Sequence, residues 1–309
     1  MILGYSAGWL LAMMNVAPLR PERPDYIQAC PGHIMRKGDP LFLSKPLEVP
    51  PYQGGDISSA KETIQELKHF QGDLDFQFSF AFQPIVNART REIISFEALV
   101  RGPLGEPSDD VLKHVYDENV FQFDQTCHRK AIHLAGKLKI RHGLHLNLFP
   151  HALYQTGMNI RATLQASLKY RLATEDIIFE LVETQKLANN RQLIDLIRMY
   201  HEFGFQTAID DFGSGYSGLN LLVEYQPNFI KFDRNLISNI HEDPVRQTVV
   251  QGILDICAKL QIQVMAEGVE TVEEFDWLRR AHVDLFQGYY FAFPAFEALP
   301  EVASELFKI

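Results

Sequence analysis

Short apolar runs alternate with helical patterns along most of this chain, and no other feature limits its fold as strongly. From residue 78 onward, eight runs have the length and apolar content of buried β-strands. They are Phe80–Val86, Ile93–Val100, Leu144–Leu148, Ile177–Val182, Gln206–Asp210, Phe229–Phe232, Gln263–Ala266 and Val283–Phe286. Helical patterns separate most of them, at Gln122–Leu138, Ala188–Phe203, Pro244–Leu260 and Val272–Ala281. Eight such strands within about 230 residues predict a (β/α)8 barrel, whose usual length is about 250 residues.

The connection between the first two runs is too short for a regular barrel. Only six residues, 87–92, separate them, whereas a crossover between parallel strands needs about a dozen residues or more. We therefore expect these two strands to form an antiparallel hairpin. The predicted fold class is α/β: a modified TIM (β/α)8 barrel with an antiparallel first strand, plus an irregular N-terminal extension.

The residues before the barrel divide into two further segments. Residues 17–55 are rich in proline and glycine and follow no helical or alternating pattern, so we expect an irregular extension of unknown role over residues 1–55. Asp56 and Ser58 precede apolar residues at helical spacing, which predicts a lead-in helix over residues 56–77. The barrel domain is then expected over residues 78–309.

Residues Ile2–Pro18 form an uncharged run that is rich in Leu, Met and Ala. The run is shorter than the roughly 20 residues of a membrane span and lacks the positive flank of a secretory signal. We favour a buried or partner-bound segment, and membrane contact through the N-terminus is the second interpretation. The net charge of -10 argues against a nucleic-acid polymer as partner. Three cysteines far apart in the sequence favour reduced thiols and a cytoplasmic protein.

Polar residues occupy the C-terminal ends of the predicted strands, where barrel enzymes place their chemistry. They are Glu97, Asn147, Glu180, Asp210, Asp211, Lys231, Glu267 and Gln287. Carboxylates that converge on one mouth repel one another unless a counter-charge offsets them, and oxygen ligands suit Mg²⁺ or Mn²⁺. Adjacent aspartates can bridge two ions about 3.5–4 Å apart, an arrangement used for phosphodiester hydrolysis. A salt-bridged barrel rim without chemistry is the alternative interpretation.

Eight short motifs occur in an order that resembles the EAL domain family. They are Gln83-Pro84-Ile85, Phe96–Arg101, Leu146-Asn147-Leu148, Glu180–Glu183, Asp210–Ser217, Lys231–Arg234, Ala266–Thr271 and Gln287-Gly288-Tyr289. The resemblance covers about residues 78–300. The tripeptide Glu97-Ala98-Leu99 alone would carry little weight because it occurs by chance, whereas eight motifs in order are specific.

The resemblance implies a phosphodiesterase that hydrolyses cyclic di-GMP to linear pGpG with two Mg²⁺ or Mn²⁺ ions, in bacterial second-messenger signalling. The implied ligands of the ions are Glu97, Asn147, Glu180, Asp210, Asp211 and Glu267. The implied catalytic residues are Lys231, Glu267 and Asp211. Lys231 would orient the attacking water, and Glu267 would act as a base. The residues implied to line the dinucleotide are Gln83, Leu99, Arg101, Glu270 and Gln287. The resemblance also implies that Glu183 anchors the loop 212–219 and that the protein forms a homodimer.

A non-hydrolytic cyclic di-GMP receptor, or a protein-interaction scaffold, is the alternative function, because some EAL domains have lost ligands. The complete ligand set favours hydrolysis. His142 and His145 flank the start of the predicted strand Leu144–Leu148, on the N-terminal side of Asn147, and are interpreted as exposed or core histidines. The aromatic residues of 289–291, with Phe293 and Phe296, are interpreted as packing residues rather than as a surface on which bases stack.

Overall fold

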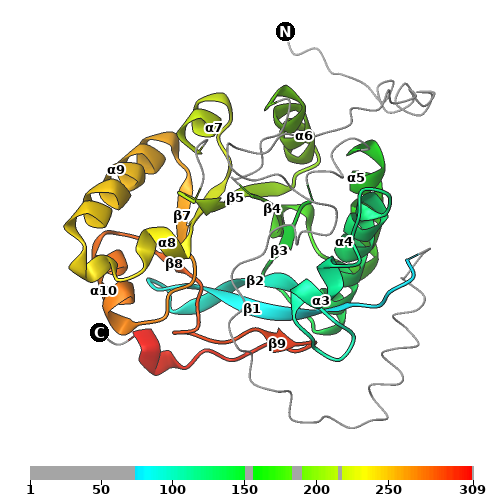
Figure 1. Ribbon diagram of the computed structural model, residues 1–309, viewed down its shortest axis with the longest axis horizontal. Coiled ribbons are helices and arrows are strands. Elements are labelled where there is room, and N and C mark those ends of the chain that lie inside the picture. The colour runs from blue at the N-terminus through cyan, green and yellow to red at the C-terminus, as the bar shows by residue number, and fades with distance from the viewer. Residues whose placement is uncertain (1–73, 150–155, 183–189, 215–217, 308–309) are drawn as a thin grey trace. The chain divides into compact units, whose positions relative to one another are not determined.

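The computed structural model describes residues 74–149, 156–182, 190–214 and 218–307 (Figure 1). All of them belong to one compact unit, Pro40–Ile309. The predicted extension over residues 1–55 and most of the predicted lead-in helix over residues 56–77 lie outside the described residues. The described part of the chain is therefore almost entirely the predicted barrel domain.

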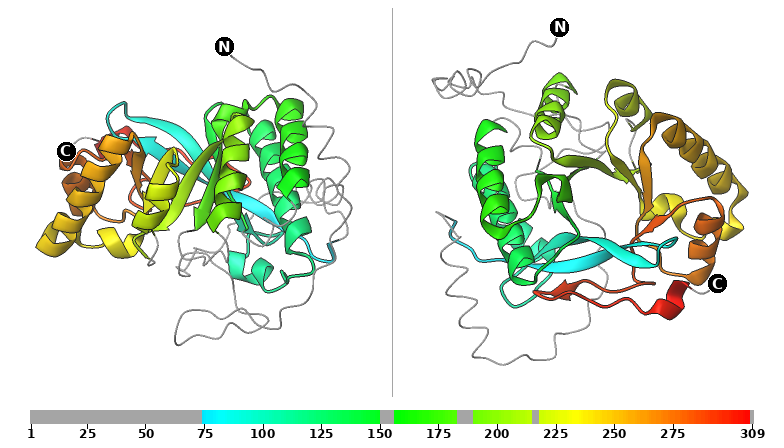
Figure 2. Two further views of the ribbon diagram at one scale, coloured as in Figure 1. Left: turned by 90° about the horizontal axis from the view of Figure 1, so that it is seen from above. Right: turned by 180° about the vertical axis from the view of Figure 1, so that it is seen from behind.

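Eight strands close into a barrel, which confirms the predicted fold class (Figure 1). In chain order they are β1 (Ser79–Asn87), β2 (Glu92–Arg101), β3 (Gly143–Asn147), β4 (Ile177–Val182), β5 (Gln206–Phe212), β6 (Phe229–Phe232), β7 (Gln263–Ala266) and β8 (Leu285–Phe286). Neighbours from β2 to β8 pair in parallel. Strand β1 closes the ring by antiparallel pairing with both β2 and β8. A short further strand, β9 (Ala295–Phe296), pairs antiparallel with β1 and lies beside it in the right view of Figure 2.

The hairpin of β1 and β2 is antiparallel, as its short connection predicts. Asn87 Oδ1 accepts the main-chain N–H groups of Arg89 (2.9 Å) and Thr90 (3.1 Å), a turn that reverses the chain. Because β1 runs against the other strands, its N-terminal half lies beside the C-terminal half of β2. This register places Gln83 opposite Glu97, at the end of the barrel where the parallel strands finish.

Helices cover the outside of the ring (Figure 1). They are α3 (Ser108–Leu112), α4 (Val120–Lys137), α5 (Thr156–Tyr170), α6 (Asn190–Glu202), α7 (Gly218–Glu224), α8 (Arg234–Ile237), α9 (Pro244–Leu260) and α10 (Val272–Arg280). The side chain of Asp243 caps α9 by accepting two main-chain N–H groups, and Thr271 and Glu274 form a capping box at α10. In the described part of the chain, no helix combines the length and the apolarity that crossing a bilayer requires.

Two layers of side chains with different chemistry fill the inside of the barrel. The lower layer is apolar and buried: Ile85, Ile178, Ala208, Phe229, Met265 and Leu285. Side chains of a strand alternate between its two faces, so the residue two positions further along faces the same side. Those next positions lie on β4, β5 and β6 and directly after the ends of β7 and β8, and they hold Glu180, Asp210, Lys231, Glu267 and Gln287. The apolar layer therefore closes the barrel below a polar layer at its C-terminal mouth.

Candidate active site

Lys231 lies at the centre of the polar layer. Its Nζ atom lies 3.0–3.1 Å from carboxylate oxygens of Glu97, Glu180, Asp210 and Glu267. Burial disfavours a charged ammonium group, but the surrounding carboxylates outweigh this effect and hold the pKa of Lys231 well above its usual value. A charged lysine therefore joins carboxylates from four parts of the barrel.

The carboxylates do not benefit equally from this lysine. Burial would raise the pKa of Glu97, but the charge of Lys231 and a hydrogen bond from Gln287 hold that pKa at about 2. Burial and repulsion by Glu97 raise the pKa of Glu180 well above its usual value. Burial likewise raises the pKa of Glu267 well above its usual value. The single positive charge of Lys231 is therefore too small to offset the negative charge of all the surrounding carboxylates.

Asp211 joins the group through an irregularity in β5. The register of β5 against β6 shifts between Ile209 and Phe212, and Asp211 has a φ of 54°. Neighbouring side chains of a regular strand point to opposite faces, and a bulge re-aims one of them. Burial and the charge of Asp210 raise the pKa of Asp211 to about 7. The bulge therefore lets two adjacent aspartates take part in one site.

Amide side chains surround Glu97. Asn147 Nδ2 donates to Glu97 Oε1 (3.1 Å), and Gln287 Nε2 donates to Glu97 Oε2 (2.8 Å). Gln287 Nε2 also donates to Gln83 Oε1 (3.2 Å), and Gln83 Nε2 donates to the main-chain oxygen of Ala292 (3.1 Å). A chain of hydrogen bonds thus runs from the carboxylates to the segment that follows β8.

His145 belongs to this group, although the sequence did not place it there. Its Nδ1 atom lies 2.8 Å from Glu180 Oε1. Burial and the charge of Lys231 lower the pKa of His145 to about 3, so the ring is neutral and can donate its Nδ1–H. Strand periodicity could have found it, because His145 stands two residues before Asn147 on the same strand face. His142 is exposed, as interpreted from the sequence.

The remaining predicted residues lie around the mouth. Leu99 and Arg101 follow Glu97 at two-residue steps along β2, and both are half-buried. Glu270 accepts a hydrogen bond from Arg234 Nη2 (2.9 Å), a partner that the sequence did not indicate. Glu183 and residues 215–217 of the loop after β5 lie outside the described residues, so the loop-anchoring role of Glu183 stays a prediction.

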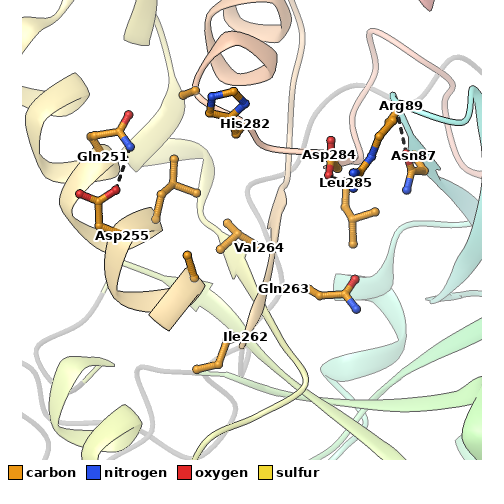
Figure 3. Close-up of a pocket in the computed structure, with 13 residues that line it drawn as sticks. Asn87, Arg89, Gln251, Asp255, Ile262, Gln263, Val264, His282, Asp284 and Leu285 are labelled. Carbon is orange, nitrogen blue, oxygen red and sulfur yellow. Dashed lines mark hydrogen bonds and ion pairs between the residues drawn. The ribbon is translucent and has the colours of Figure 1, made fainter. Parts of the chain in front are cut away.

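A separate pocket of about 460 Å³ lies at the other end of the barrel (Figure 3). It is lined by the first residues of β7 and β8, by α9 and by the β1–β2 turn, where Arg89 pairs with Asp284. None of the predicted site residues lines it. Because barrel enzymes place their chemistry at the C-terminal ends of the strands, the polar layer is the candidate active site and this pocket is not.

The donor set of the polar layer fits divalent cations. Among the described residues, no three Asp, Glu, His or Cys side chains already surround a metal position, and Lys231 lies between the carboxylates instead. Oε2 of Glu180 is nevertheless buried without a hydrogen-bond partner. When ionised, the five carboxylates at residues 97, 180, 210, 211 and 267 exceed the lysine by four negative charges, which two divalent cations would offset. Carboxylate and amide oxygens are ligands that Mg²⁺ and Mn²⁺ prefer.

Comparisons with known proteins show the family and support the fold. Residues 67–294 match the EAL domain family. A standalone versatile EAL protein from Vibrio cholerae O395, solved in its c-di-GMP-bound form, is 48% identical with a TM-score of 0.74, over 77% of this chain and 100% of that chain. The manganese/cyclic di-GMP complex of BlrP1 from Klebsiella pneumoniae is 35% identical with a TM-score of 0.70, over 73% of this chain and 58% of that chain.

Curated relatives carry several kinds of name. The blue light- and temperature-regulated antirepressor BluF of Escherichia coli (strain K12) is 34% identical over 225 residues, which cover 72% of this chain and 56% of BluF. Several other curated relatives are named cyclic di-GMP phosphodiesterases. The matched part covers between 24% and 56% of the length of three of these relatives.

Proposed function

The chain belongs to the EAL domain family, and we propose that it hydrolyses cyclic di-GMP to linear pGpG with two bound Mg²⁺ or Mn²⁺ ions, in bacterial second-messenger signalling. One observation carries the proposal: four carboxylates converge on Lys231 Nζ within 3.0–3.1 Å at the mouth of the barrel. Buried carboxylates without enough positive charge nearby destabilise a fold. They can bind divalent cations, and the cations in turn can bind a phosphate group.

The proposal assigns the ligands of the two ions. Residues that would hold the first ion are Glu97, Asn147, Glu180 and Asp210, and those that would hold the second are Asp210, Asp211 and Glu267. When bound, the ions supply counter-charge for the phosphate and draw the pKa of a bound water down toward neutrality. The dinucleotide would lie against Gln83, Leu99, Arg101, Glu270 and Gln287.

The chain's own side chains position the water and move its proton. Lys231 holds a fixed positive charge between Asp210 and Glu267 and orients the attacking water. Glu267 keeps 23% of its side chain exposed and accepts the proton of that water. The water oxygen bonds to phosphorus as the bond from phosphorus to O3′ breaks. O3′ takes up a proton from solvent, and Glu267 releases to solvent the proton that it accepted. The product is a linear dinucleotide with a 5′-phosphate and a free 3′-hydroxyl.

Chromatography of cyclic di-GMP after incubation with the full chain tests the proposal. We expect pGpG to form with Mn²⁺ or Mg²⁺ and to disappear when a chelator is added. Ca²⁺ should inhibit, because calcium prefers longer bonds and more ligands than a tight ion pair allows. Unchanged cyclic di-GMP in Mn²⁺, with a protein that is folded by circular dichroism, would refute hydrolysis.

A second candidate function is a receptor or interaction scaffold that binds cyclic di-GMP without cleaving it. The relative BluF, which is named an antirepressor, favours this candidate. Binding of intact cyclic di-GMP in calorimetry, together with no product in Mn²⁺, would establish it over hydrolysis.

We also propose that the protein is a cytoplasmic homodimer that pairs through α9. Exposed apolar side chains follow one face of this helix at Val245, Val249, Ile256 and Leu260. Gly252 lies on the same face, and a side chain added there would meet open space, so another helix can approach closely. Sedimentation of Ile256→Glu should show a monomer where the unaltered protein shows a dimer; equal sedimentation of the two would exclude this face.

A further inference from the structure

Two aromatic residues after β8 form a stacked pair. The ring centroids of Tyr289 and Phe293 lie 4.3 Å apart, with 26° between the ring planes. Tyr290 and Phe291 instead pack against the buried ring of Phe275. The interpretation of this aromatic run as core packing therefore holds for Tyr290 and Phe291. It is wrong for Phe293, which is 51% exposed.

Hydrogen bonds hold the pair beside the candidate active site. Gln83 Nε2 donates to the main-chain oxygen of Ala292 (3.1 Å), the residue directly before Phe293. Gln83 also accepts a hydrogen bond from Gln287, whose amide donates to Glu97 at 2.8 Å. Three hydrogen bonds, through Gln83 and Gln287, thus link the residue before Phe293 to the carboxylate of Glu97.

Tyr289 lies near two residues that are proposed to line the dinucleotide. Burial raises the pKa of the Tyr289 phenol, and the charges of Arg101 and Glu270 both act on it. Exposed charges are largely screened beyond about 8–10 Å at physiological ionic strength, and partly buried charges are screened less. The aromatic pair therefore shares the mouth of the barrel with Arg101.

The backbone beneath the pair is rigidly held. A Cβ atom at Gly288 would lie 2.1 Å from the main-chain oxygen of Val269, so the two backbones are in direct contact. Val269 N–H donates to Gln287 O and Tyr290 N–H donates to Val269 O, both at 3.0 Å. An exposed aromatic ring on a fixed backbone loses little further conformational freedom when a ligand covers it.

We propose that Phe293, supported from behind by Tyr289, is the platform on which one guanine base of the bound dinucleotide stacks. The inference rests on the proposed function and adds a base-recognition residue to it. An aromatic ring offers any base a stacking partner worth about 1–3 kcal/mol. The planar fork of Arg101 is suited to the O6 and N7 edge of a guanine. Phe293 would thus contribute affinity, and Arg101 would contribute the choice of base.

Substitution of Phe293 tests the platform by binding and by kinetics. Phe293→Ala should raise the Kd for cyclic di-GMP about 5- to 150-fold, the equivalent of one lost stacking contact. It should raise KM with little change in kcat, because the base is remote from the phosphorus that reacts. Phe293→Trp should retain tight binding. Leu168→Ala is the matched control, since Leu168 is 78% exposed on α5, outside the candidate site.

A fluorescent probe separates stacking from a general loss of structure. The fluorescence of a 2-aminopurine analogue of the cyclic dinucleotide should be quenched on binding to the unaltered protein and to Phe293→Trp. Quenching should be much weaker with Phe293→Ala, even when that variant is present at a concentration that binds all of the probe. Equal Kd and equal quenching in the unaltered protein and Phe293→Ala would overturn the platform. Failure of the unaltered protein to bind or cleave cyclic di-GMP would instead refute the proposed function.

Discussion

Nδ1 of His145 lies 2.8 Å from Oε1 of Glu180 in the buried layer at the mouth of the barrel. The neutral ring can donate its Nδ1–H to this carboxylate, which is proposed to hold an ion, and can thereby fix its direction. Loss of a group that orients a metal ligand typically costs about 10- to 100-fold in activity or metal affinity. We therefore expect His145→Leu to lower turnover of cyclic di-GMP by that factor and to shift the Mn²⁺ titration to higher concentration.

A second histidine, three residues earlier in the chain, provides the control. His142 precedes the same strand and is exposed, so His142→Leu should leave both the turnover and the Mn²⁺ titration unchanged. His145→Gln keeps an N–H donor and should fall between the two. Equal Mn²⁺ titrations for His145→Leu and His142→Leu would show that His145 only fills space.

Lys231 should contribute much more to stability without metal than with it. Its removal leaves buried carboxylates without their positive partner, and breaking a buried pair in this way costs about 3–5 kcal/mol. Lys231→Met should therefore lower the free energy of unfolding by about that amount in chelator, as measured by urea denaturation. Added Mn²⁺ should restore most of the loss, because the cations then supply the missing charge.

An exposed ion pair serves as the comparison for Lys231. Lys113 Nζ lies 2.8 Å from Asp110 on the surface, where such a pair contributes about 0–1 kcal/mol. Lys113→Met should change the unfolding free energy little in either condition. The electrostatic role of Lys231 would be excluded if Mn²⁺ stabilised the Lys231→Met protein no more than the unaltered one.

Strand periodicity explains why much of the fold and the polar layer could be predicted from the sequence. The bounds of β4, β6, β7 and α9 are those that the apolar patterns predicted. Pairs such as Ile178 with Glu180, two residues apart on one strand, place an apolar side chain below a polar one. The short β1–β2 connection also predicted the antiparallel hairpin correctly.

Features that depend on contacts between distant segments could not be predicted in the same way. The bulge that brings Asp211 toward the mouth is a backbone irregularity with no distinct sequence pattern. The pairing of Arg234 with Glu270 joins α8 to the segment before α10, 36 residues later. Phe293 lies two residues before β9, whose pairing with β1 joins distant segments and which is too short to show periodicity.

Lys130 makes the stability depend on pH in the alkaline range. It is fully buried in α4, donates to Phe78 O (3.1 Å) and lies 4.2 Å from the Phe78 ring centroid. Burial lowers its pKa to about 8, below the value of about 10.4 in an unfolded chain. The unfolded chain therefore binds the proton more tightly than the folded protein. The free energy of unfolding rises with pH between about 8 and 10, and below pH 8 the buried charge lowers it by the full amount.

The comparison with Lys130→Met isolates this effect. Between pH 7 and pH 10, the unaltered protein should gain about 1–3 kcal/mol of unfolding free energy relative to the variant. Urea denaturation at both pH values measures the difference. Lys259→Met, at an exposed position of α9, should show no such change. A constant difference between the unaltered protein and Lys130→Met across this range would mean that Lys130 keeps its usual pKa.

Arg234 should control how firmly Glu270 is held at the mouth. Arg234 Nη2 donates to Glu270 (2.9 Å), while Nη1 donates to Glu274 (2.8 Å), whose side chain is fully buried. Glu274 Oε1 also accepts the main-chain N–H of Asn239 at 3.0 Å, so this residue of α10 is held by the segment that follows α8 as well. A guanidinium group can serve two carboxylates in fixed directions, whereas the ammonium of lysine is a single point charge.

We therefore expect Arg234→Lys to raise the KM for cyclic di-GMP about 2- to 10-fold, roughly one lost hydrogen bond of ordinary strength, with kcat nearly unchanged. The reason is that Glu270 is proposed to contact the dinucleotide away from the reacting phosphorus. Arg279→Lys is the control, because Arg279 pairs with Asp276 on the outer side of α10 at 3.3 Å and should leave both constants unaltered. A large fall in kcat for Arg234→Lys would instead place Arg234 in the support of the metal ligands, and equal kinetics for the two variants would show that Glu270 is held without it.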